Sequence, residues 1–276
     1  MVKKLFKHEI LAYLRVFIPM QIILQSVAIL YRLLQLNKTD NDVLNIIEGT
    51  TVFAYAMCLI ISFSLIGVFA IVRFYRNLFT HEGYLSFTLP VSTSQHILVK
   101  LFTAVLFEIL TVIGMLVSFV IVTVGEFLIE LIKAADYLFK DFLKLLETIP
   151  LTLTDVIFYV IEAVVLMFIA TCAGLLLMYC CIAIGQTFKK NRVMGAVAIY
   201  FIYSVVCQFL TSIISTVVTM FADFEKIVEW VEKMCTEHPY EMIHAGFSVM
   251  ILVYAVMGVI YFAVARFVIS RKLNLE

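Results

Sequence analysis

Long, uninterrupted runs of apolar residues dominate this chain, and short alternating patterns do not. A transmembrane helix needs about 20 mainly apolar residues to cross about 30 Å of hydrocarbon. Six stretches meet this condition, at about residues 17–36, 50–72, 97–125, 156–186, 193–221 and 243–266. Strands of a membrane barrel would instead alternate apolar and polar residues over short segments. The pattern therefore predicts an all-α integral membrane protein with six transmembrane helices, in which residues 1–276 form a single domain.

Three polar segments outside these spans carry apolar residues at helical spacing. Before Pro19, such a stripe consists of Phe6, Ile10, Leu11 and Leu14. We expect an interfacial helix on the cytoplasmic face that turns into the first span near Pro19. A plain extension of the first span is the alternative. Residues 126–147 and 224–234 carry similar stripes, which predict amphipathic extracytoplasmic helices that cover the bundle.

The basic residues are distributed unevenly between the two sets of loops. With the amino terminus in the cytoplasm, the inner segments hold 12 of the 20 lysines and arginines and the outer segments hold 6. The remaining two, Arg15 and Arg32, lie at the ends of the first span. The positive-inside rule then places both termini in the cytoplasm. Most acidic residues lie in the outer loops, which we attribute to exclusion from the negatively charged inner leaflet.

Composition narrows the class of protein further. The chain is 63% hydrophobic and 14% charged, whereas about 25% of an average soluble domain is charged. Its 20 basic and 20 acidic residues leave no basic excess for nucleic acid, so we expect no nucleic-acid partner. Five of the six cysteines fall inside spans, so no disulfide framework is predicted. We expect a multi-pass protein of the cell (plasma) membrane, surrounded by membrane lipids.

The cytoplasmic loop of residues 73–96 has an unusual composition. It is too polar to span the membrane and too rich in aromatic residues to be a free linker, so it predicts a docking surface for a soluble partner. Near its end, Pro90 is followed by Ser92-x-x-Gln95. This spacing predicts a capping box at the start of the third span.

This loop resembles a known family. The sequence from Tyr75 reads Tyr-Arg-Asn-Leu-Phe-Thr-His-Glu-Gly-Tyr-Leu-Ser-Phe-Thr-Leu-Pro-Val-Ser, and Lys100 opens the next span. It is similar to the ABC-2 type transporter permeases, bacterial membrane proteins in which an EGYL-x-x-TLPVS-like loop joins spans two and three. The resemblance implies the permease subunit of an ABC transporter, which pairs with a second copy or a homologous permease and docks a separate ABC ATPase.

In such permeases the loop forms a coupling helix that sits in a groove of the ATPase. By position, the resemblance assigns docking to Arg73, Arg76, Thr80, His81, Glu82, Gly83 and Tyr84. Alternatively, the two arginines only anchor the chain at the inner leaflet and Gly83 only forms a turn. The chain lacks a phosphate-binding Gly-x-x-x-x-Gly-Lys-Ser/Thr motif. We therefore expect no directly bound cofactor, and ATP to act through the partner subunit.

Two acidic residues lie within spans, Glu108 and Glu162. A charge at the centre of a lone transmembrane helix costs about 2.5–3.5 kcal/mol, so each side chain should face protein or water or be protonated. They are candidates for a transport path. The alternative is a neutral carboxyl group hydrogen-bonded to a neighbouring helix.

An enzyme is disfavoured, because the five histidines lie away from the middle of the spans and no His-Glu-x-x-His motif occurs. No catalytic residue and no metal ligand is predicted. The acidic outer loops favour export over import. A membrane scaffold or accessory subunit that transports nothing remains the alternative function.

Overall fold

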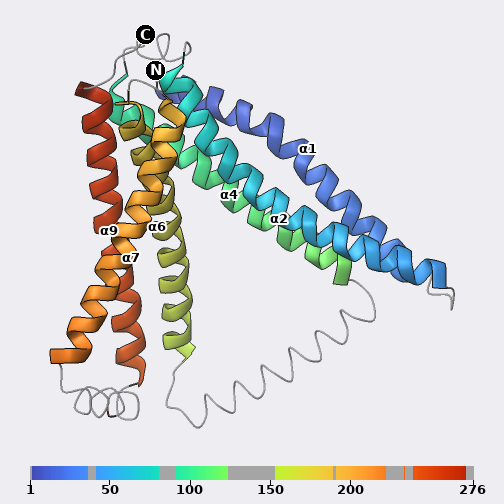
Figure 1. Ribbon diagram of the computed structural model, residues 1–276. Helices are drawn as coiled ribbons and strands as arrows, with labels where there is room; N and C mark the ends of the chain where they lie inside the picture. The colour runs from blue at the N-terminus through green and yellow to red at the C-terminus, as the bar shows by residue number, and fades with distance from the viewer. Residues whose placement is uncertain are drawn as a thin grey trace. The chain divides into compact units, whose positions relative to one another are not determined.

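The computed structural model describes residues 2–36, 42–80, 91–123, 153–188, 191–221, Lys233 and 239–271. Within them, six helices follow one another (Figure 1): α1 (Val2–Leu36), α2 (Asp42–Phe79), α4 (Thr93–Thr123), α6 (Leu153–Gly185), α7 (Arg192–Phe221) and α9 (Pro239–Arg271). All six are long and apolar enough to cross a membrane. This confirms the predicted all-α class and the six spans. Apart from Lys233, the predicted outer helices at 126–147 and 224–234 lie outside the described residues.

The chain divides into two compact units. The first comprises Met1–Phe74 and Pro90–Leu153, and the second comprises Tyr75–Leu89 and Thr154–Glu276. Each unit is described by itself below. How the two pack into the expected single domain stays a prediction.

Helix α1 passes through Pro19 without interruption. Proline removes one backbone hydrogen bond, a loss that transmembrane helices tolerate when neighbouring groups satisfy the freed carbonyl. With 35 residues, α1 is about 52 Å long, which exceeds the hydrocarbon thickness of about 30 Å. The amino-terminal segment and the first span are therefore one continuous helix. Placement of the first turns at the membrane surface stays a prediction.

In the first unit, α1 packs against both α2 and α4 through a layer of aromatic rings. Tyr13 of α1 is fully buried and stacks on Phe107 of α4, with ring centroids 5.0 Å apart. Its other neighbour is Phe69 of α2, which it meets edge-on at 4.9 Å. Phe17, one turn farther along α1, also contacts Phe107 edge-on at 5.3 Å. Such offset and edge-on pairs are the preferred geometries of aromatic rings.

Farther along the same bundle, polar side chains join the helices. Gln25 of α1 donates through Nε2 to the carbonyl of Gly114 on α4 at 2.8 Å. The hydroxyls of Tyr55 on α2 and Ser118 on α4 lie 3.0 Å apart. From the aromatic layer to these polar contacts, the residue numbers increase along α1 and along α4 and decrease along α2. Helices α1 and α4 are therefore parallel, and α2 runs antiparallel to both.

In the second unit, small residues let the helices approach. Gly258 of α9 lies against Ala173 of α6, where a glycine and an alanine give two helix backbones room to come close. The turn from α6 to α7 contains Asn191, whose φ of 54° falls in the left-handed region that asparagine tolerates. Its carbonyl accepts a hydrogen bond from the backbone N–H of Gly195 at 2.9 Å.

Candidate functional site

A buried carboxylate joins all three helices of the first unit. Glu9 of α1 accepts a hydrogen bond from the Nζ of Lys100 on α4 through Oε1, at 2.6 Å. Its other oxygen, Oε2, forms an ion pair with the Nε of Arg73 on α2. The side chains of Glu9 and Lys100 are only 3% and 6% exposed, and that of Arg73 is 23% exposed. Charge-assisted hydrogen bonds of this kind are about twice as strong as neutral ones.

The position of Glu9 follows from the periodicity of α1. The face of α1 that packs into the protein carries Glu9, Tyr13, Met20, Leu24 and Ala28, all of them buried. Successive members are four or seven residues apart, so they share one stripe of the helix. Glu9 was not among the residues predicted from the sequence. The signal that could have found it is an acidic residue in register with this stripe, four residues before Tyr13.

The predicted docking residues are only partly described. Helix α2 continues to Phe79, so Arg73 and Arg76 lie on its last turns. Thr80 follows the helix and donates from Oγ1 to the carbonyl of Arg76 at 2.5 Å. The other four predicted positions, His81, Glu82, Gly83 and Tyr84, lie outside the described residues.

The capping box at the far end of the loop is confirmed. The backbone N–H of Ser92 donates to Oε1 of Gln95 at 3.1 Å. In return, the N–H of Gln95 donates to Oγ of Ser92 at 3.4 Å. Helix α4 begins at Thr93, the residue directly after Ser92. This reciprocal pair satisfies backbone donors that have no partner within the helix.

Glu162, one of the two acids within spans, is hydrogen-bonded to a neighbouring helix. Its Oε2 lies 2.9 Å from Nδ1 of His244 on α9. The ring of His244 stacks on Tyr159 of α6, with centroids 4.3 Å apart. Both side chains of the pair are partly exposed, at 25% for Glu162 and 34% for His244. This geometry favours the alternative in which Glu162 joins two helices over a role in a transport path.

Glu108 has a different environment. It is half-buried on α4, directly after the buried Phe107. Among the described residues, no hydrogen bond or ion pair reaches its carboxylate. Glu108 therefore stays a candidate for a transport path. A bundle of three or more His, Cys, Asp or Glu side chains able to hold a metal ion is not found in the described part of the chain.

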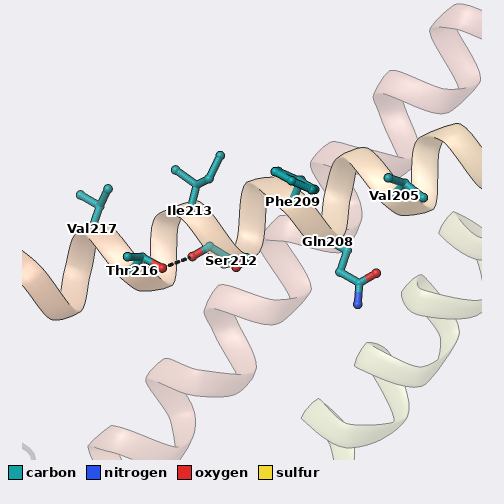
Figure 2. A pocket seen from close by; sticks show the side chains of 7 residues that line it. All are labelled: Val205, Gln208, Phe209, Ser212, Ile213, Thr216 and Val217. Atoms are coloured by element: carbon teal, nitrogen blue, oxygen red, sulfur yellow. Dashed lines mark hydrogen bonds between the residues drawn. The ribbon is translucent and has the colours of Figure 1, made fainter.

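A groove of about 500 Å³ runs along one helix of the second unit (Figure 2). It is lined by side chains of α7 between Val205 and Val217, with Gln208, Ser212 and Thr216 at successive turns. Thr216 donates from Oγ1 to the carbonyl of Ser212 at 2.8 Å, so its hydroxyl is satisfied within the helix. Gln208 is exposed and points away from the apolar members of the groove. Because all of these residues lie on one helix, the groove alone identifies no ligand.

No protein-family profile, curated protein or solved structure matches this chain, so these comparisons assign it to no family. The resemblance to ABC-2 type permeases therefore rests on the loop sequence and on the arrangement of the spans. What the fold supports directly is a membrane protein with six apolar helices.

Proposed function

We propose that this protein is the permease subunit of an ABC transporter of the cell membrane, and that a separate ATPase drives it from the cytoplasmic side. Closure of the ATPase would push on the loop between α2 and α4, and these helices would carry the movement into the membrane. This would be a two-state switch whose populations depend on nucleotide. We propose export as the direction, and a second copy or a homologous permease as the other half of the assembly.

The observation that carries this proposal is the loop sequence from Glu82 to Ser92, which follows the EGYL-x-x-TLPVS-like pattern. Its setting supports the same proposal. The loop lies between two long apolar helices, α2 and α4, and the second begins with a capping box at Ser92. A capped and therefore well-defined helix start suits a loop that must transmit a push.

The test is co-purification with an ATPase. An ABC ATPase subunit encoded beside this gene is expressed together with the tagged permease, and the complex is isolated in mild detergent. We expect the wild-type chain to retain the ATPase, and Glu82→Arg and Gly83→Pro to lose it. The matched control is Glu48→Arg, the same change of charge near the other end of α2, which should leave association intact.

Normal ATPase association in both loop variants would contradict the docking assignment. An equal loss in the Glu48→Arg control would indicate general damage to the fold, and the loss in the loop variants would then not support docking at this loop. A wild-type chain that binds no ATPase, or the lack of an ATPase gene beside this one, would favour the scaffold function.

A further inference from the structure

The ion-pair cluster of Glu9, Arg73 and Lys100 lies close to both ends of the cytoplasmic loop. Arg73 precedes the end of α2 at Phe79 by about two turns, and Lys100 follows the start of α4 at Thr93 by about two turns. Neither cation is bonded to the other in the cluster. Each is held by its own oxygen of Glu9. A single side chain of α1 thus connects the two helices from which the loop extends.

We propose that Glu9 is a positioning residue for this loop, and that its carboxylate fixes the spacing of the two helices that present the docking surface. The inference rests on the proposed function in one respect only, namely that the partner that docks is an ABC ATPase. The spacing of α2 and α4 is a property of the chain itself and can be measured without any partner.

The electrostatics explain why an acid is needed at this position. Arg73 and Lys100 are both cations in a largely buried site, where the effective dielectric constant is lower than in water and like charges repel strongly. The Glu9 carboxylate converts this repulsion into two attractive contacts. Its removal takes the shared negative charge away from both cations. Removal of either cation instead leaves Glu9 paired with the remaining one.

The two oxygens of Glu9 make the contributions of the helices separable. Lys100→Gln should loosen the start of α4 and leave the end of α2 in place, because Arg73 keeps its own oxygen. Arg73→Gln should do the reverse. Glu9→Gln should loosen both helices at once, and the double variant Glu9→Gln with Lys100→Gln should restore part of the order because the repulsion is gone.

Hydrogen–deuterium exchange of the full-length protein in lipid nanodiscs tests this pattern. For Glu9→Gln, we expect exchange at least about tenfold faster in residues 70–79 and 93–101, because charged hydrogen bonds contribute enough to protection for such a change. Exchange in α6 and α9 should not change. The matched control is Glu48→Gln, the same substitution near the other end of α2, which should leave both segments as in the wild type.

Several outcomes would overturn the inference. They are unchanged exchange at both helix ends in Glu9→Gln, uniform acceleration over the whole chain, or a Lys100→Gln variant that loosens both ends equally. If Glu9→Gln does not fold, the two single-cation variants still decide the matter.

Association with the ATPase is then measured on the same variants. If docking depends on the spacing, Glu9→Gln should need about tenfold more ATPase for half-maximal association. A tenfold change in the exchange rate and a tenfold change in the ATPase concentration for half-maximal association correspond to the same free energy. If exchange changes as expected but the wild type binds no ATPase, the positioning role stands and the proposed function fails.

Discussion

The turn between α6 and α7 provides a sharp test of how closely these helices pack. Gly185 is the last residue of α6 and faces Ala196 of α7. A Cβ atom placed on Gly185 would lie 2.6 Å from the backbone nitrogen of Ala196 and 2.7 Å from its Cα. Favourable contacts between such atoms need about 3.5–4.0 Å. Because the obstacle is backbone, Gly185→Ala requires the helices to move apart by about 1 Å.

Gly174, on the same helix, is the matched control. A Cβ atom there would meet nothing within 4 Å. Gly174→Ala gains helix propensity, worth about 0.5–1 kcal/mol in a helix interior, whereas Gly185 is the last residue of α6 and gains less. Gly185→Ala also has an overpacking cost, which is typically about 1–3 kcal/mol. Both effects have the same sign, so we expect Gly185→Ala to be less stable than Gly174→Ala by at least the overpacking cost.

Reversible unfolding in mixed micelles, with increasing fractions of a denaturing detergent, measures this difference. The fraction of denaturing detergent at which half of the protein is unfolded should be lower for Gly185→Ala than for the wild type. For Gly174→Ala, this fraction should equal or exceed the wild-type value. Equal stability of the two variants would refute the close approach of α6 and α7. Hydrogen exchange should place the loosening at the α6–α7 turn.

Three further predictions concern polar side chains of the long apolar helices. Tyr55→Phe should cost about 0.6–1.7 kcal/mol of unfolding free energy, because it removes the hydrogen bond to Ser118. Ser118→Ala removes this bond together with the one from its own Oγ to the carbonyl of Met115, so the double variant should cost no more than Ser118→Ala alone. Glu162→Gln and His244→Ala should show the same lack of additivity, since their side chains form one pair; additive losses in a double-variant unfolding cycle would contradict either pair. Glu108→Gln should lower transport in a reconstituted vesicle assay without reducing ATPase association, and unchanged transport would remove Glu108 from the path.

The elements themselves could be predicted from the sequence. Each span is an apolar run long enough to identify by itself, and the capping box was visible in the spacing of Ser92 and Gln95. The end of α2 was harder to predict. The charges of Arg73 and Arg76 marked the end of the apolar run, but the helix continues to Phe79. Charged side chains do not interrupt backbone hydrogen bonds, and Phe74 and Leu78 continue the apolar stripe by one further turn.

The ion-pair cluster could not be predicted in the same way. Lys100 was visible at the start of its span, and Arg73 was visible as a candidate for docking. Their pairing with Glu9 depends on how three helices align, and this alignment cannot be predicted from any single segment of the sequence. The pairing of Glu162 with His244 is similar, because the two residues are far apart in the chain and meet only when α6 packs against α9.

The central claim is that an ATPase outside this chain acts on the loop between α2 and α4 from the cytoplasm. The most direct measurement asks on which side of the membrane Tyr84 lies. Tyr84→Cys is introduced together with Cys235→Ser, and cells are treated with a membrane-impermeant maleimide before or after permeabilisation. The unmodified chain, with Cys235 in a predicted outer loop, is the control for external labelling.

We predict that Tyr84→Cys reacts only after permeabilisation, whereas Cys235 of the unmodified chain reacts in intact cells. Labelling of Tyr84→Cys in intact cells would place the loop outside. A cytoplasmic ATPase could not reach it there, and this result would contradict the account.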